Sequence, residues 1–147
     1  MHSSSNAIET VPTADAHNPR FSVVGFYAVA VLFNLCLIAQ LLTAGIAYFE
    51  NPSWWQVHSW LVRGYSGLSL VLLAWAYGAA FSRRIRILTV SMPILLGIQF
   101  LTIHWHPSFL PVSPAVVHPL VGFSLVSVSS TLVHRSWRLV SPTAAAD

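Results

Sequence analysis

The stretch Phe21–Phe49, FSVVGFYAVAVLFNLCLIAQLLTAGIAYF, decides the fold, because it contains no charged side chain. About 20 predominantly apolar residues in a helix cross the hydrocarbon core of a bilayer, so this stretch is long enough to span it with tilt. The sequence Glu50-Asn51-Pro52-Ser53 interrupts the apolar run. We therefore predict a first transmembrane helix over residues 21–49.

Three further apolar segments follow, over about residues 57–81, 85–104 and 115–133. The connections between them are short, which favours antiparallel neighbours. The sequence therefore predicts an all-α fold, a polytopic membrane four-helix bundle with antiparallel up-down topology, over residues 21–140. Residues 1–20 have the composition of a disordered cytoplasmic tail, and residues 141–147 form a second, flexible tail. No convincing internal repeat is evident.

The composition points to lipid as the solvent of this protein. Of its 147 residues, 55% are hydrophobic and 7% are charged, and the mean hydropathy is +0.66. An ordinary soluble domain carries about 25% charged residues. We therefore expect the lipid bilayer to be the principal partner, and the pI near 9.6 does not indicate nucleic acid. It reflects arginines that flank the apolar segments.

The arginines also predict an orientation. All but one lie on the same side of the predicted bundle: Arg20, Arg83, Arg84, Arg86, Arg135 and Arg138. The positive-inside rule then predicts a multi-pass protein of the cell membrane with both termini in the cytoplasm. The exception, Arg63, lies near the outer end of the second segment.

Polar residues within the apolar segments are candidates for function, because ionisable groups in a membrane are costly. His58 and His118 each open a segment at the outer side, and the two segments run in the same direction. Neutral imidazole is a ligand of haem iron. We therefore predict that His58 and His118 are the axial ligands of one haem b near the outer face.

Other residues would support this haem. Arg63 would supply a cation for a propionate, and Gln40 and Gln99 would contact the haem or a quinone. Glycines on the same two helices, Gly64, Gly67 and Gly122, would leave room for the macrocycle. The predicted activity is electron transfer with a membrane redox partner or quinone. The loops are too short for a soluble active site, which favours a protein that is not an enzyme on its own.

Two alternatives stay open from the residues alone. In the first, the histidines only form hydrogen bonds, and the chain is a cofactor-free accessory or scaffolding subunit. In the second, His104 and His106 bind a metal ion such as copper or zinc. Two ligands are too few for a structural zinc site, so His58 or His118 would have to complete it.

Short motifs along the chain resemble a family of bacterial four-helix integral membrane proteins of unknown function. They are Gln40 followed by Ala44-Gly45, Trp55-x-x-His58, Gln99, and His118-Pro119. The resemblance covers about residues 21–140 and implies that the polar residues among these form one site. It implies no activity. The general plan is also similar to that of four-helix b-type cytochromes, an analogy of architecture.

Overall fold

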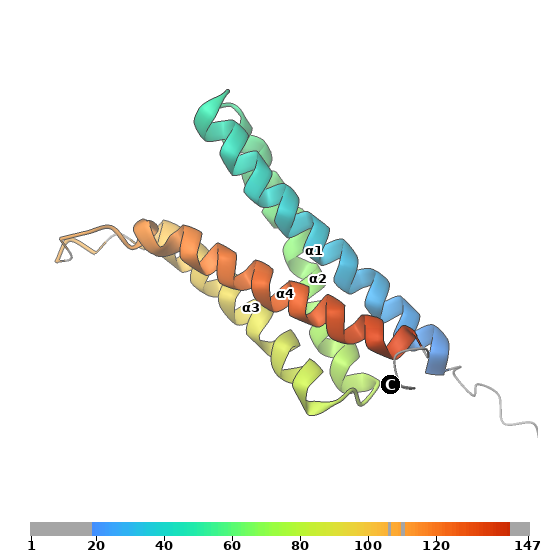
Figure 1. Ribbon diagram of the computed structural model, residues 1–147. Helices are drawn as coiled ribbons and strands as arrows, with labels where there is room; N and C mark the ends of the chain where they lie inside the picture. Colours follow the sequence, from blue (N-terminus) through green and yellow to red (C-terminus); the bar gives the residue numbers. More distant parts are fainter. Residues whose placement is uncertain (1–18, 106, 110, 142–147) are drawn as a thin grey trace, which may run out of the picture.

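The computed structural model describes residues 19–105, 107–109 and 111–141. Its helices are α1 (Pro19–Phe49), α2 (Trp54–Gly78), α3 (Arg83–His104) and α4 (His118–Val140), and a 3-10 turn, η1 (Pro114–Val117), leads into α4 (Figure 1). The described residues contain no strand, and the four helices pack together. The predicted all-helical fold is confirmed. Most of both predicted tails, residues 1–18 and 142–147, lies outside the described residues.

The helices form a ring in which each contacts two neighbours. Antiparallel packing of α1 and α2 is shown at both ends, where Trp75 Nε1 donates to Ser22 Oγ (2.9 Å) and Gln40 Nε2 donates to the main-chain oxygen of His58 (3.0 Å). On its other side α1 packs against α4, and α3 packs against α4 and α2. Among the residues described, α1 does not contact α3 and α2 does not contact α4. These two pairs therefore lie on the diagonals of the ring.

The connection between α2 and α3 is a Schellman turn. The amide of Phe81 donates to Ala76 O (3.1 Å) and the amide of Ala80 donates to Tyr77 O (3.2 Å), while Ala80 has a φ of 51°. This pair of bonds satisfies carbonyls left free at a helix end. The Phe81 ring then packs on Phe26, with 4.5 Å between ring centroids. The turn thereby fixes the end of α2 against the start of α1.

Apolar side chains fill the interior and also cover the outside. Phe33, Leu72, Met92 and Leu132 are fully buried, while many large apolar residues, such as Leu42, are exposed. The segments Arg20–Phe49, Arg83–His104 and Pro114–Val140 are long and apolar enough to cross a membrane. The 25-residue α2 is not among these segments, and its first turns carry Gln, His, Ser and Arg side chains. An exposed apolar surface on three such helices identifies a membrane protein.

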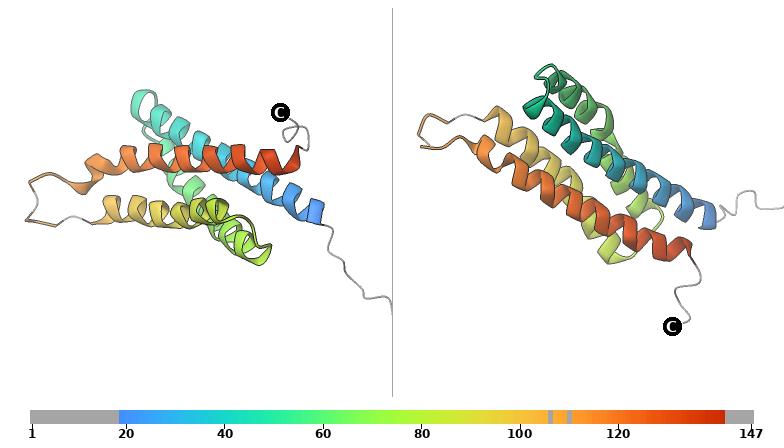
Figure 2. Two further views of the ribbon diagram at one scale, coloured as in Figure 1. Left: turned by 60° about the horizontal axis from the view of Figure 1, so that its bottom comes forward. Right: turned by 45° about the horizontal axis from the view of Figure 1, so that its top comes forward.

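The two helical hairpins, α1–α2 and α3–α4, diverge toward the ends that carry their loops (Figures 1 and 2). At the opposite end the start of α1 and the end of α4 lie side by side, and the rings of Tyr27 and Trp137 are 5.5 Å apart there. His58 and His118 both lie near the diverging ends, at the starts of α2 and α4.

Candidate cofactor site

His58 continues the buried stripe of α2. It precedes the buried Tyr65 by two helical turns and the fully buried Leu72 by four. Residues at this heptad spacing share one face of a helix. His58 is half-buried, because the stripe reaches the level at which the hairpins diverge. Its imidazole therefore lies on the inner face of α2.

Three contacts with α1 hold His58 in place. Its Nδ1 lies 3.1 Å from the main-chain oxygen of Gln40 and 3.3 Å from Thr43 Oγ1. Thr43 Oγ1 also lies 2.9 Å from that same Gln40 oxygen. The side chain of Gln40 returns to α2, where Nε2 donates to the main-chain oxygen of His58. The ring of Trp55 packs edge-on against the imidazole, with 5.5 Å between centroids.

The same arrangement surrounds His118. Its Nδ1 lies 3.2 Å from the main-chain oxygen of Gln99 and 3.2 Å from Thr102 Oγ1, and Thr102 Oγ1 lies 2.8 Å from that oxygen. The hydrogen-bond network orients the Gln99 amide so that its nitrogen donates to the main-chain oxygen of His118 (2.7 Å). Its oxygen then accepts from the amide of Gly122 (3.3 Å).

These contacts select one tautomer of each imidazole. A carbonyl oxygen can only accept a hydrogen bond, so the bonds to Gln40 O and Gln99 O assign the ring proton to Nδ1. The Gln99 side-chain nitrogen, itself a donor, also lies 3.2 Å from His118 Nδ1, and with the proton on Nδ1 this approach is not a hydrogen bond. The Nε2 atom of each neutral ring then carries a free lone pair. In the part of the chain that the structure describes, neither Nε2 has a hydrogen-bond partner. Imidazoles that bind metals are commonly fixed in this way, by a carbonyl that accepts from the opposite ring nitrogen.

The two histidines lie on helices at opposite corners of the ring of helices. Among the described residues, the backbones of α2 and α4 do not pack against each other. Two half-buried imidazoles on helices that do not touch can approach one group from opposite sides. The structure thus brings the predicted residues together in two pairs, Gln40 with His58 and Gln99 with His118.

The three glycines expected to leave room for a cofactor lie in different surroundings. Gly64 and Gly67 are exposed, and an added Cβ at either position would meet no atom within 4 Å. Neither glycine forms a hydrogen bond with His58 in the described part of the chain, and both are exposed where Tyr65 and Leu72 of the same helix are buried. Gly122 is buried, and a Cβ there would lie 3.1 Å from the amide of Gln99. Gly122 therefore lets Gln99 approach α4.

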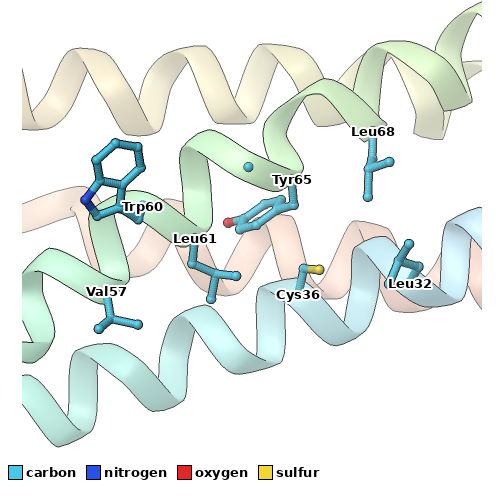
Figure 3. A pocket seen from close by; sticks show the side chains of 8 residues that line it. Leu32, Cys36, Val57, Trp60, Leu61, Tyr65 and Leu68 are labelled. Atoms are coloured by element: carbon cyan, nitrogen blue, oxygen red, sulfur yellow. The ribbon is translucent and has the colours of Figure 1, made fainter.

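Arg63 is exposed on the surface of the helix bundle. Its guanidinium stands over the ring of Trp60, 5.7 Å from the centroid. Beside these residues a shallow groove of about 600 Å³ runs between α1 and α2 (Figure 3). Its lining is almost entirely apolar, as expected for a surface in contact with acyl chains: Leu32, Cys36, Val57, Trp60, Leu61, Gly64, Tyr65 and Leu68. Since His58 is not part of this lining, the groove and the histidine site are separate.

The residues proposed for a metal-ion site do not assemble within the described part of the chain. His104 is exposed at the end of α3, and its Nδ1 lies 2.8 Å from the main-chain oxygen of Phe100. His106 lies outside the described residues. The described residues contain no group of three or more His, Cys, Asp and Glu side chains that could hold a metal ion.

Sequence reasoning missed Thr43 and Thr102, which contact both the imidazole and the carbonyl at each histidine. A signal was present, because Gln-x-Leu-Thr occurs at residues 40–43 and again at 99–102. One further polar atom stands out. Gln40 Oε1 is buried and has no hydrogen-bond partner among the described residues.

Part of the chain is similar to a protein family whose function is unknown. Residues 40–104 match the family described as "Family of unknown function (DUF6220)". The match includes Gln40, His58, Arg63, Gln99 and His104 and ends before His118. Searches of curated proteins and of solved structures gave no match. The chain is thus similar to a family of unknown function, in agreement with the resemblance drawn from its motifs.

Proposed function

We propose that this protein is a small b-type haem protein of the cell membrane that transfers electrons. In this proposal all four helices span the bilayer, both termini lie in the cytoplasm, and one haem lies near the outer face. Nε2 of His58 and Nε2 of His118 would hold its iron. The observation that supports the proposal best is the pair of imidazoles whose Nδ1 atoms are both held by a main-chain carbonyl.

The donor set fits haem better than a bare metal ion. Zinc in a structural site takes four protein ligands, whereas haem iron receives four nitrogens from the macrocycle and needs two from the protein. Two imidazoles from helices on a diagonal of the ring meet that need. When bound, the haem would supply a one-electron couple. The hydrogen bonds at Nδ1 would orient both rings and increase their basicity.

The membrane orientation follows from charge. The ends opposite the histidines carry Arg83, Arg84, Arg86, Arg135 and Arg138. The positive-inside rule assigns that side to the cytoplasm. The histidines then lie near the outer surface, where a haem could exchange electrons with a membrane redox partner or a quinone. Loops this short offer no soluble active site, so we propose that the protein works with such a partner.

Optical spectra of the detergent-purified protein test this proposal. We expect a sharp Soret band and α band after reduction with dithionite in the wild type. His58→Ala and His118→Ala should each lose the haem or change its spectrum. His134→Ala is the matched control, because His134 is exposed at the far end of α4. A colourless protein after expression with ample haem would refute the proposal and favour an accessory subunit without a cofactor.

A further inference from the structure

The hairpins α1–α2 and α3–α4 bury residues at equivalent positions. On α1 the buried residues Phe26, Ala30, Phe33 and Leu37 recur 59 positions later on α3, and on α2 the buried residues Tyr65, Ser69, Leu72 and Ala76 recur 60 positions later on α4. The matching residues are Ile85, Thr89, Met92, Leu96, Leu125, Ser129, Leu132 and Ser136. Most of these pairs differ in side chain and share only their burial, so the repeat is clear in the structure and faint in the sequence.

Contacts between the halves repeat as well. The rings of Tyr27 on α1 and Trp137 on α4 have centroids 5.5 Å apart. The positions that correspond to them in the other half are Arg86 on α3 and Tyr77 on α2. There the guanidinium lies 5.5 Å from the ring centroid. A two-fold rotation that exchanges the hairpins accounts for both contacts, and parallel repeats in membrane proteins are related by an axis of this kind.

Identity between the halves is concentrated at the histidines. Gln-x-Leu-Thr is followed by Val-His in each half, at Gln40–Thr43 with Val57-His58 and at Gln99–Thr102 with Val117-His118. The atoms repeat too: the distances from Nδ1 to the carbonyl are 3.1 and 3.2 Å, and those from Nδ1 to the threonine oxygen are 3.3 and 3.2 Å. Elsewhere among the buried pairs, only Leu37 and Leu96, Ser69 and Ser129, and Leu72 and Leu132 are identical.

We infer that the chain is an internal duplication of one helical hairpin, and that both hairpins build one ligand site on the axis between them. Thr43 and Thr102 are matched positioning residues for His58 and His118. A ligand on such an axis meets the same groups on both faces, as a planar metal macrocycle with two equivalent axial positions requires. The identity of that ligand rests on the proposed function, whereas the duplication and the positioning do not.

The threonines act through the imidazoles. Each hydroxyl contacts Nδ1 and also hydrogen-bonds to the carbonyl that receives the ring proton. Replacement by valine keeps the shape of the side chain and removes both contacts. The hydrogen bonding of the Nδ1 proton is weakened. Nε2 then becomes less basic and donates less electron density to a bound metal. Thr89→Val is the matched control, since Thr89 is buried on α3 and bonds a main-chain oxygen of its own helix, that of Arg86 (2.9 Å).

Nitrogen NMR of the haem-free full-length protein with ¹⁵N-labelled histidine tests the inference directly. Signals are assigned by their loss in His58→Gln and His118→Gln. We expect both rings to be neutral with the proton on Nδ1. Thr43→Val should shift the signals of His58, Thr102→Val should shift those of His118 in the same direction, and Thr89→Val should shift neither. A proton on Nε2 in either ring, or opposite responses to the two valines, would overturn the inference.

The haem-loaded protein separates this inference from the proposed function. With haem bound, Thr43→Val and Thr102→Val should both raise the reduction potential, by similar amounts, while Thr89→Val leaves it unchanged. Unequal responses in a haem-binding protein would contradict the matched site and leave the proposed function standing. A chain that binds no haem but shows the paired NMR responses would refute the haem and support the inference.

A circular permutant tests the duplication itself. The permuted chain begins at Arg83, continues to Val140, passes through a short linker to Pro19 and ends at Gly78. The joined ends lie side by side (Figure 1). We expect a helical monomer whose His58 and His118 signals match those of the wild type. Disturbed signals in a permutant that is folded and monodisperse would contradict two interchangeable hairpins.

Discussion

His58 Nδ1 lies 3.1 Å from the main-chain oxygen of Gln40, so an imidazole in the second turn of α2 is held by the backbone of α1. The equivalent bond joins α4 to α3 through His118 and Gln99 at 3.2 Å. In both hairpins a residue near the loop is thus fixed by the neighbouring helix. The free Nε2 atoms that result are the basis of the proposed function.

Gly25 permits the close packing of α1 on α2. A Cβ at this position would lie 2.8 Å from Cη2 of Trp75, whose Nε1 donates to Ser22. Gly25→Ala should displace the indole and cost about 1–3 kcal/mol. Thermal unfolding in detergent, followed by circular dichroism, measures the loss. Gly45→Ala is the control and should cost nothing, because a Cβ there meets no atom within 4 Å.

Ala80 adopts a left-handed conformation with a φ of 51° in the turn between α2 and α3. A residue with a Cβ is strained there, and glycine is not. Ala80→Gly should therefore stabilise the protein by about 0.5–1 kcal/mol once the greater freedom of glycine in the unfolded chain is deducted. Ala79→Gly, at a φ of −91°, should give no gain. Equal effects of the two substitutions on the unfolding temperature would show that the strain is absent.

The orientation in the membrane is tested by labelling single cysteines. In a Cys36→Ser background, Asn51→Cys lies in the α1–α2 connection and Ser82→Cys in the α2–α3 connection. A maleimide that cannot cross membranes should label Asn51→Cys in intact cells. It should label Ser82→Cys only after permeabilisation. The reverse pattern would contradict an outer location of the histidines.

The metal-ion alternative predicts behaviour that differs from that of a haem protein. Haem iron is held by the macrocycle, so EDTA should leave the absorption spectrum of the wild type unchanged. His104→Ala and His106→Ala should also leave it unchanged. Metal analysis of the purified protein should find iron in proportion to haem. Stoichiometric zinc or copper that EDTA removes, and that His104→Ala abolishes, would instead favour the metal-ion site.

Much of the fold could be predicted because apolar length and its interruptions determine where membrane helices begin and end. The run before Glu50 became α1 and the break at Ser82 separates α2 from α3. The end of α4 was less visible, because His134–Val140 is polar enough to resemble a flank although it remains helical. Amphipathic residues of this kind lie at a membrane surface without ending the helix.

The site could be predicted only in part. Ionisable residues in apolar segments drew attention to His58 and His118, and depth along the helices grouped Gln40 and Gln99 with them. Which face each residue occupies is set by packing, so Arg63 lies outward over Trp60. The repeat escaped detection because pairs such as Phe26 and Ile85 share burial and not identity.

We propose that His58 and His118 bind one iron. Electron paramagnetic resonance of the oxidised, haem-loaded protein tests it most directly, because two imidazole ligands give a low-spin ferric signal and one gives a high-spin signal. We expect a low-spin signal in the wild type that becomes high-spin in any haem that His58→Ala or His118→Ala retains. A high-spin wild type, or a low-spin signal that survives both substitutions, would contradict it.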